Sequence, residues 1–321
     1  MTDAAAVAVR GLGVAYDGRP VVHDVDLDVV AGSILAIVGE SGCGKSSAAL
    51  ALCRLLPGNA TTVGVATVAG IDVLAASGAA LRELRGTLVG YVPQSSSASL
   101  NPVRSVGTHL TELFRLRGGA RRGEARRRAA DALREVEIPD PERVLRLYQH
   151  ELSGGMRQRV AIAMALALRP RVLIADEPTT ALDTTVQHEI LALAQRLRDE
   201  LGTTIVWITH DLGVVGAIAD EVAVMYAGRV VEQAPVRELF ETACHPYTKA
   251  LLASYESGRV GGTRTPFAAI DGQPPMADVP SGCAFHPRCP VATARCAVDV
   301  PISVAVAPGH RAACHLLEAG S

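Results

Sequence analysis

The chain has 321 residues, of which 49% are hydrophobic and 20% are charged. This composition allows a sizeable buried core, so global disorder is excluded, and the length predicts about two domains. The 31 basic and 33 acidic residues give a net charge of −2, and only 3% of the residues are aromatic. Both values argue against a basic surface with base-stacking side chains, so we expect no nucleic acid partner.

No part of the sequence predicts a membrane span or an export signal. The longest apolar run, around 160–168, falls short of the roughly 20 residues needed to cross a bilayer. The first residues, Met1-Thr2-Asp3, lack the positively charged start of a secretory signal. We therefore expect a protein of the cytosol, where its seven cysteines stay reduced.

Strands and one helix are predicted near the start of the chain. Short apolar alternations predict strands over 7–9, 21–29 and 33–38, with a hairpin turn at Asp17-Gly18. A glycine-rich turn begins at Gly39, and a helix follows over 46–56, where Pro57-Gly58 ends it. Residues 33–56 therefore predict a strand–loop–helix unit.

Strands and helices alternate as far as about residue 235. Strands are predicted at 87–93, 172–175 and 204–208, and helices at 103–150, 154–168 and 184–200. This alternation predicts an α/β core with a buried parallel sheet. Five arginines in 121–128 favour a solvated helix face over a patch for anions or lipid headgroups. Beyond Pro235 the periodicity weakens, and the Gly-rich segment 257–265 reads as a linker.

Residues 39–46 read Gly-Glu-Ser-Gly-Cys-Gly-Lys-Ser and match the phosphate-loop pattern G-x-x-x-x-G-K-[ST]. Glycines let backbone N–H groups turn toward phosphate oxygens, and the following helix presents its positive N-terminus to the anion. Lys45, one of only two lysines in the chain, can reach the β- and γ-phosphates, and the Ser46 hydroxyl can coordinate Mg²⁺. The position between a strand and a helix supports a nucleoside triphosphate site.

Asp176 and Glu177 directly follow the apolar strand 172–175. Strand ends in an open α/β sheet face the ligand crevice. There, Asp176 can hold Mg²⁺ through water, and Glu177 can orient and deprotonate an attacking water. Two carboxylates beside a phosphate loop predict hydrolysis of the nucleotide.

Residues 152–159, Leu-Ser-Gly-Gly-Met-Arg-Gln-Arg, resemble the signature sequence of ATP-binding cassette (ABC) proteins. Other pieces that resemble this family follow in its order: Tyr16, Gln94, Asp183 after Ala181-Leu182, and His210 in Ile-Thr-His-Asp. The resemblance covers about residues 5–235. It implies an α/β fold of the P-loop NTPase class, with a RecA-like core, an antiparallel β subdomain and a helical subdomain at about 96–158.

The resemblance also implies a role for each matching residue. Tyr16 would stack on adenine, Glu177 would be the general base, and His210 would link it to the γ-phosphate. The ATP-binding set would be Tyr16, Gly39, Glu40, Ser41, Gly42, Cys43, Gly44, Lys45, Ser46, Ser47, Gln94 and Asp176, with Ser46, Gln94 and Asp176 toward Mg²⁺. No cassette motif departs from the family pattern, so a hydrolytic half-site is expected.

Two cassettes of this family pack head to tail, which implies that the signature of one chain serves the ATP of its partner. The expected contact residues are Ser153, Gly154, Gly155, Gln158 and Asp183. Two helix N-termini would then face one charged phosphate group, which no single cassette encloses. ATP would hold the dimer closed, and hydrolysis would release it.

Three further segments resemble the oligopeptide/dipeptide importer cassettes, a bacterial subfamily that also includes nickel and glutathione importers. They are Ser-Leu-Asn-Pro at 99–102, Cys-His-Pro-Tyr-Thr-Lys-Ala-Leu-Leu at 244–252 and a cysteine-containing tail from Pro280. The resemblance implies a cassette at 1–235 and a C-terminal extension at 236–321.

The tail holds Cys283, Cys289, Cys296 and Cys314, spaced Cys-x5-Cys-x6-Cys-x17-Cys. Four thiolates suit Zn²⁺ or an iron–sulfur cluster, but the Cys-x2-Cys pairs usual in zinc ribbons are absent. The longer gaps favour a bulkier group, and subfamily members with this tail are similar in carrying a 4Fe-4S cluster. Zn²⁺ and metal-free thiols stay open. His286, His310 and His315 are alternative ligands, although surface positions are favoured for them.

The resemblance implies the ATPase subunit of a bacterial ABC importer for di- or oligopeptides or related small solutes, bound peripherally at the cytoplasmic face of the inner membrane. The expected partners are a second ABC ATPase subunit, with a heterodimer favoured, two transmembrane permeases that bind near 96–158, and an extracytoplasmic solute-binding protein. The rivals are a nickel or glutathione importer, a non-transport ABC ATPase and a regulatory cassette that only binds ATP. Intact Glu177 and His210 oppose the last of these.

Overall fold

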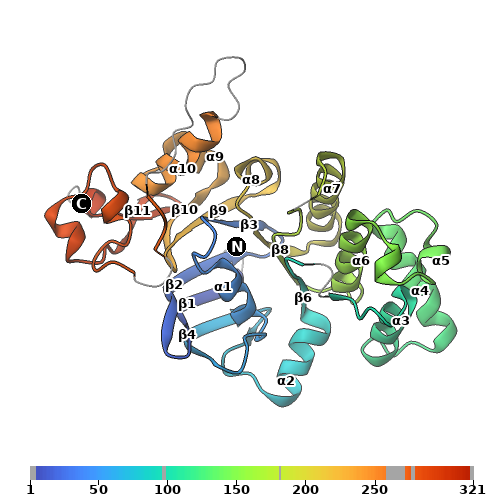
Figure 1. Ribbon diagram of the computed structural model, residues 1–321. Helices are drawn as coiled ribbons and strands as arrows, with labels where there is room; N and C mark the ends of the chain where they lie inside the picture. The colour runs from blue at the N-terminus through green and yellow to red at the C-terminus, as the bar shows by residue number, and fades with distance from the viewer. Residues whose placement is uncertain (1–4, 96–98, 181, 258–271, 276–278, 319–321) are drawn as a thin grey trace.

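Two β-sheets organise the computed structural model, which describes residues 5–95, 99–180, 182–257, 272–275 and 279–318. One is a four-stranded sheet in the order β2-β1-β4-β5, and the other has eight strands in the order β11-β12-β10-β9-β3-β8-β7-β6. Figure 1 shows the small sheet below the middle of the large one, a helical group at one end and the C-terminal segment at the other.

The four-stranded sheet is an antiparallel layer made by the N-terminal strands. These are β1 (Ala5–Tyr16), β2 (Arg19–Val30), β4 (Ala60–Val68) and β5 (Ile71–Asp72). Asp17 and Gly18 link β1 to β2 with φ values of 50° and 76°, as a two-residue hairpin turn of this hand requires. Alternate residues of β1, among them Val7 and Val9, are buried and join helix α1 (Lys45–Leu52) in one hydrophobic cluster.

The middle of the large sheet is parallel and buried on both faces. It consists of β3 (Ile34–Val38), β6 (Val89–Val92), β7 (Val172–Asp176), β8 (Thr204–Ile208) and β9 (Glu221–Tyr226). Every residue of β3, β7 and β8 is buried, because α1 covers one face and α7 (Thr184–Leu201) and α8 (Leu212–Ile218) cover the other. The carboxyl ends of these strands therefore meet at one edge of the sheet.

A helical group lies against the β6 edge of the large sheet (Figure 1). It contains α3 (Val106–Leu116), α4 (Arg122–Glu135), α5 (Pro141–Val144), the 3-10 turn η3 (Gln149–Glu151) and α6 (Gly154–Leu166), while α2 (Gly78–Glu83) and the π-helical turn η1 (Leu84–Leu88) precede β6. This group corresponds to the helical subdomain expected at 96–158, of which 96–98 lie outside the described residues. None of the described helices combines the length and the apolar character needed to cross a membrane.

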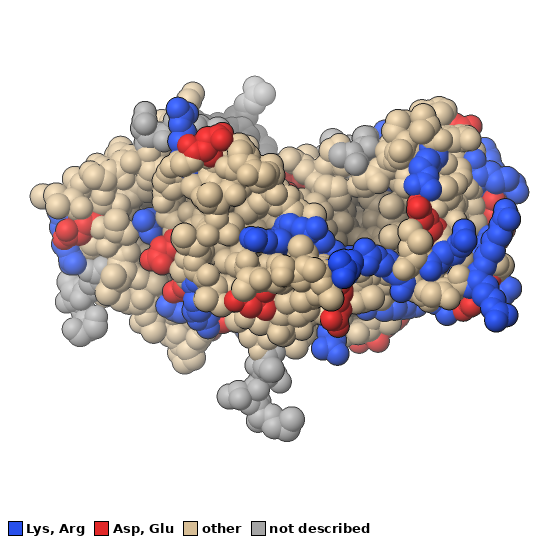
Figure 2. All heavy atoms as spheres, turned by 90° about the horizontal axis from the view of Figure 1, so that it is seen from below, with Lys and Arg blue, Asp and Glu red and all other residues tan. Residues whose placement is uncertain are grey.

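The arginines of 121–128 lie on the solvent side of α4. All five are exposed, and Arg126 and Arg128 form ion pairs with Glu142 and Glu124. Figure 2 shows basic side chains at this end of the molecule with acidic ones among them. The pairing with acidic neighbours fits the expected solvated face better than an anion-binding patch.

The C-terminal extension continues the large sheet. After β10 (Arg229–Pro235), helices α9 (Val236–Thr242) and α10 (Pro246–Ser257) pack on the sheet. The remaining elements are the 3-10 turns η4 (His286–Arg288) and η5 (Ala294–Ala297), strands β11 (Ser303–Ala307) and β12 (His310–Ala313), and helix α11 (His315–Glu318). Because β12 pairs with β10, the two sides of the boundary expected at 235 share one sheet. The expected linker 257–265 lies outside the described residues except for Ser257.

A buried carboxylate joins the extension to the cassette. Glu232 of β10 is 1% exposed, and its oxygens accept hydrogen bonds from the backbone N–H groups of Cys244 (2.6 Å) and His245 (2.9 Å). His310 Nε2 lies 2.7 Å from the same carboxylate. His310 and His315 are 1% and 7% exposed, so the surface positions expected for these two histidines were wrong. His310 lies on β12, which pairs with β10, whereas His315 lies on α11, with its Nε2 2.9 Å from the carbonyl oxygen of Asp299.

Glu232→Ala should destabilise the protein by about 3 kcal/mol, because two buried N–H groups and an imidazole lose their acceptor. The control is Glu241→Gln, which removes an exposed ion pair with Arg237 on α9 and should cost about 0.5 kcal/mol or less. Urea unfolding followed by circular dichroism measures both free energies. Equal effects of the two variants would contradict the joining role of Glu232.

Candidate active site

The loop 39–46 connects the buried end of β3 to the first turn of α1. Gly39 has a φ of 154°, and Gly44, the N-cap of α1, has a φ of 98°. A Cβ atom at Gly39 would lie 2.1 Å from the carbonyl oxygen of Met225, so no larger residue fits there. No side chain caps α1 at its N-terminus. Its first N–H groups are therefore available to an anion, and Ser41 and Gly42 form an exposed rim beside them.

Lys45 places its ammonium group inside this loop. The side chain is buried, with the residue 5% exposed. Its Nζ donates to the carbonyl oxygens of Gly39 (2.8 Å) and Glu40 (3.0 Å). Cys43 is also buried, and burial raises the pKa of its thiol although Lys45 lowers it. Cys43 therefore fills space inside the loop, and Lys45 supplies the positive charge of the loop.

Ser46 and Asp176 bring two oxygens together next to the loop. Ser46 Oγ donates to Asp176 Oδ1 at 3.1 Å, and Tyr91 Oη lies 3.5 Å from Oδ2. Burial raises the pKa of Asp176, against the lowering effect of the Ser46 hydrogen bond. A hydroxyl and a carboxylate beside a phosphate site suit Mg²⁺, which would favour the charged carboxylate.

Glu177 has polar partners on three sides. Its Oε2 accepts hydrogen bonds from Gln94 Nε2 (2.9 Å) and Thr180 Oγ1 (3.0 Å), and His210 Nδ1 lies 3.3 Å from Oε1. Burial alone would raise the pKa of Glu177, but the hydrogen bonds from His210, Thr180 and Gln94 outweigh it and hold the pKa below its ordinary value. Glu177 is therefore a carboxylate at neutral pH. Gln94, expected toward Mg²⁺, donates to this carboxylate.

Tyr16 lies at the end of β1, and its hydroxyl donates to Ser47 Oγ on α1 at 3.1 Å. This contact places the hydroxyl end of the side chain next to the helix that begins with Lys45. Stacking on adenine stays a prediction, because the contact fixes the hydroxyl and not the face that a base would use.

The signature segment is remote from the phosphate loop of the same chain. Ser153 is the N-cap of α6, and its Oγ accepts from the N–H of Met156 at 3.2 Å. Ser153 and Gly154 are exposed. None of the hydrogen bonds among the described residues joins this segment to 39–47, and Figure 1 shows α6 in the helical group, away from α1. Within one chain, the signature segment and the phosphate loop are therefore separate.

Gln158 and Asp183, both expected at the contact between cassettes, differ in exposure. Gln158 is 4% exposed and its Nε2 is buried without a hydrogen-bond partner, so it does not present its side chain to a second protein. It points into the interior because the helix turns it toward the core. Asp183 is exposed and is the N-cap of α7, where Oδ1 accepts from the N–H of Val186 at 2.9 Å. Its neighbour Ala181 lies outside the described residues.

The four tail cysteines gather around the 3-10 turns of the extension. Cys296 and Cys314 are buried, and Cys283 donates its N–H to the carbonyl of Cys296 at 2.8 Å. Burial raises the pKa values of the Cys283 and Cys289 thiols, and the neighbouring cysteines add to the rise. No three of these sulfurs lie within 4.8 Å of one another in the described structure. This spacing is wider than the about 3.8 Å between sulfurs around tetrahedral Zn²⁺.

Glu232, Cys244 and His310 do bring three ligand atoms within 4.8 Å. Sequence reasoning missed this group, because its members are far apart along the chain. The Glu232 oxygens already accept two backbone N–H groups and lie beside His310. The group is therefore a structural junction of the extension, and the Cys-His-Pro motif at 244–246 was its only sequence signal.

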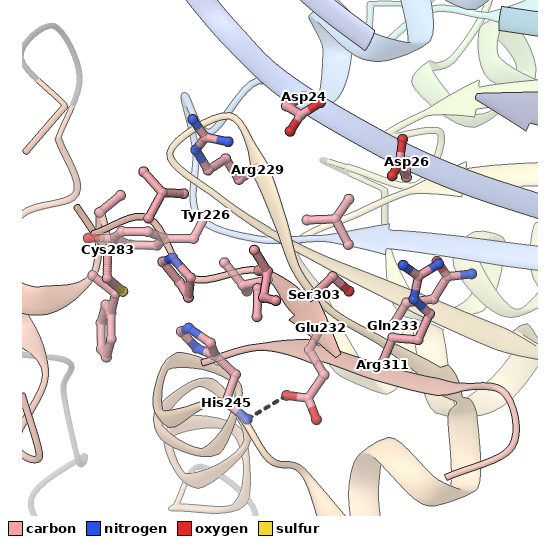
Figure 3. Close-up of a pocket in the computed structure, with 18 of the residues that line it drawn as sticks. Asp24, Asp26, Tyr226, Arg229, Glu232, Gln233, His245, Cys283, Ser303 and Arg311 are labelled. Atoms are coloured by element: carbon pink, nitrogen blue, oxygen red, sulfur yellow. Dashed lines mark hydrogen bonds between the residues drawn. The ribbon is translucent and has the colours of Figure 1, made fainter. Parts of the chain in front are cut away.

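A cavity of about 440 Å³ separates part of the extension from the cassette (Figure 3). Charged residues of both signs line it: Asp24, Asp26, Arg229 and Arg311. Tyr226 and Cys283 lie at one end of the view, and Gln233 and Arg311 lie at the other. No residue of the phosphate loop lines this cavity. It is therefore distinct from the nucleotide site, and the extension contacts the cassette around its margins.

Family comparisons agree with both halves of the sequence. The ABC transporter family model matches residues 22–180, and the model of the oligopeptide/dipeptide transporter C-terminal region matches residues 231–296. A probable peptide ABC transporter ATP-binding protein of Sinorhizobium fredii is 48% identical over 293 residues, which are 90% of this chain and 87% of that protein. The oligopeptide transport ATP-binding protein OppD of Salmonella typhimurium is 44% identical over 294 residues, with 91% and 87% covered.

Solved structures match over the cassette. A dimeric ATP-binding cassette in a post-hydrolysis state, bound to ADP and Pi, has a TM-score of 0.64 and 28% identity, and covers 72% of this chain and 99% of its own. The cassette cbiO1 from Clostridium perfringens, part of an ABC transporter complex, has a TM-score of 0.64 and 30% identity, with 74% and 92% covered.

His210→Ala should move the acidic limb of the pH–rate profile of nucleotide hydrolysis to higher pH. The histidine holds the pKa of Glu177 down, so without it the pKa rises and less carboxylate is present at a given acidic pH. Phosphate release measured between pH 4 and 9 locates the limb. His188→Ala, an exposed histidine on α7, is the control and should leave it in place. If the acidic limb of His210→Ala stays at the wild-type pH, His210 does not lower the pKa of Glu177.

Proposed function

The chain belongs to the ABC transporter family, and we propose that it is the ATP-hydrolysing subunit of an importer for di- and oligopeptides. Its ATPase character rests on the family and on the site itself. The observation that carries the ATPase part of the proposal is the side chain of Glu177, held by Gln94, Thr180 and His210 next to the phosphate loop. A regulatory cassette that only binds ATP has no need of this arrangement.

The residues of the site divide the work of hydrolysis among them. Backbone N–H groups of 39–46 and the Lys45 ammonium bind the phosphates and stabilise the charge that develops on them. Ser46 and Asp176 would hold Mg²⁺, which neutralises phosphate charge when bound. Glu177 orients a water molecule against the γ-phosphate and accepts its proton at the carboxylate, while His210 holds that carboxylate in place.

The phosphate loop and the signature segment are separate in one chain, which supports a closed pair of two cassettes. The loop of one chain and the exposed helix start at Ser153 of another would enclose one ATP between two positive helix ends. We propose Ser153, Gly154, Gly155 and Asp183 as the contact residues. The separation of α6 from the loop in one chain supports this arrangement. We favour a different but homologous chain as the second cassette.

Two permeases and an extracytoplasmic solute-binding protein complete the proposed importer, with this chain at the cytoplasmic face of the inner membrane. A cavity of about 470 Å³ lies between β6, η1 and helices α3 and α6. Leu113, Met164 and Leu168 give it an apolar wall. A groove between the core and the helical subdomain suits a short permease helix. Pro93 lines this groove, and the next residue, Gln94, donates a hydrogen bond to Glu177.

We also propose that Cys283, Cys289, Cys296 and Cys314 hold a 4Fe-4S cluster, with Zn²⁺ as the alternative. What supports the proposal is that the thiol of Cys283 lies within electrostatic range of the other three, and that four thiolates with long gaps along the chain suit a cuboidal cluster. A bound cluster would tie η4, η5 and the end of β12 together. Such a tie suits a small extension in which few of the described hydrophobic residues are buried.

Glu177→Gln should bind ATP but lower hydrolysis by a factor of about 100 or more, because the general base is lost while the phosphate contacts remain. Glu112→Gln, which removes an exposed ion pair with Arg104, is the control for loss of one negative charge. Phosphate release and retention of a fluorescent ATP analogue are the measurements. Undiminished turnover in Glu177→Gln would remove the assigned base.

The substrate class is tested in a strain that lacks the gene and requires one amino acid. Growth on a peptide that supplies this amino acid should depend on the wild-type gene, and Glu177→Gln should not restore it. Undisturbed peptide use together with a loss of nickel or glutathione uptake would contradict the peptide assignment.

Anaerobic purification should give a brown protein with about four iron atoms per chain. Cys289→Ser should lose iron, while Cys53→Ser, at a buried cysteine outside the extension, should keep it. Metal analysis and visible absorption provide the measurement. A colourless protein with stoichiometric zinc would overturn the cluster.

A further inference from the structure

Glu40, the second residue of the phosphate loop, has partners from outside the loop at its backbone N–H and at its carboxylate. Its backbone N–H donates to Tyr247 Oη at 3.0 Å, and its carbonyl accepts from Lys45 Nζ at 3.0 Å. Its carboxylate receives Arg288, with Nη1 at 2.7 Å from Oε2 and Nη2 at 3.0 Å from Oε1. Two parallel hydrogen bonds between a guanidinium and a carboxylate fix orientation as well as charge.

Arg288 comes from the cysteine-rich extension, 248 positions later in the chain. Its side chain is 6% exposed. It also donates to Tyr226 Oη at 3.3 Å and stacks over the Tyr226 ring with 5.8 Å between the guanidinium carbon and the ring centroid. The guanidinium of Arg288 is therefore buried within its contacts. In this it differs from the exposed ion pairs elsewhere on the chain.

An aromatic cluster supports the segment that presents Arg288. Tyr226 of β9, Tyr247 of α10 and Phe285 of the extension are mutually packed, with ring centroids 4.6 to 5.4 Å apart. The N–H of Arg288 donates to the carbonyl of Phe285 at 3.0 Å. Arg288 is also the neighbour of Cys289, so the turn of the cysteine segment sets the position of the guanidinium.

The charges of the loop explain why this contact matters for nucleotide binding. The loop must receive a triphosphate, and Glu40 places a carboxylate in that same loop. An unpaired carboxylate there would repel the phosphates and compete with them for Lys45, whose Nζ already contacts the Glu40 carbonyl. Arg288 neutralises the carboxylate and holds it on the side of the loop that faces the extension.

We propose that Arg288 is a positioning residue for the phosphate loop, and that through it the cysteine-rich extension sets the affinity of its own chain for ATP. This inference rests on the proposed ATP-binding function. The extension thereby becomes part of the nucleotide site, although none of its residues is placed against the nucleotide.

Arg288→Gln should raise the Kd for ATP about tenfold or more, since the half-buried Glu40 carboxylate in the loop loses its counter-charge. The KM for ATP should rise in parallel, while kcat should stay within about twofold, because Glu177 and His210 are untouched. The control is Arg295→Gln. It removes the same charge from the same extension at an exposed ion pair with Asp299 and should leave Kd unchanged.

Combining Glu40→Gln with Arg288→Gln separates loop positioning from simple anchoring of the extension. The double variant carries no unpaired carboxylate, so it should bind ATP at least about threefold more tightly than Arg288→Gln alone, which a mere loss of anchoring would not allow. Titration of a fluorescent ATP analogue into the full chain gives Kd, and thermal unfolding shows that each variant is folded.

Two outcomes would overturn the inference. One is an Arg288→Gln variant with wild-type affinity, and the other is a double variant as weak as Arg288→Gln alone. Either result leaves the proposed ATPase intact as long as the wild type binds and hydrolyses ATP. Failure of the wild type to bind ATP would instead remove the proposed function.

Discussion

A cation held inside a loop of backbone groups is the interaction on which the rest of this site depends. Lys45 is 5% exposed and its ammonium rests on two carbonyl oxygens of its own loop. Burial of a charge is costly unless polar partners surround it, so the loop must keep one close-fitting shape. Gly39, with a carbonyl oxygen 2.1 Å from where its Cβ would be, enforces that shape. The anion site is thus prepared before any nucleotide arrives.

The remainder of the chemistry is arranged around this cation by the parallel sheet. Asp176 and Glu177 stand at the end of β7, and the sheet places that end beside the loop. The two carboxylates are then given different environments. Burial raises the pKa of Asp176, whereas hydrogen bonds lower the pKa of Glu177. Asp176 is suited to bind a metal ion, and Glu177 is suited to accept a proton. Different environments thus give two adjacent acids different roles.

The extension is joined to the cassette at three kinds of contact. β12 continues the large sheet at β10, Glu232 gathers Cys244, His245 and His310, and Arg288 grips Glu40. The first two fix the extension in space, and the third reaches the phosphate loop. A short path of packed groups therefore connects the cysteine segment to the phosphate loop. Elsewhere between the extension and the cassette lies a cavity.

The sequence by itself determined the local units: the phosphate loop between a strand and a helix, the acidic pair after β7, and the strand Thr204–Ile208. Such motifs are legible because their chemistry lies within a few neighbouring residues. Only the tertiary structure decided that Gln158 is buried, that His310 and His315 lie inside, and that Arg288 meets Glu40. These facts depend on pairing between β10 and β12 and on packing of residues far apart along the chain, which no local pattern encodes.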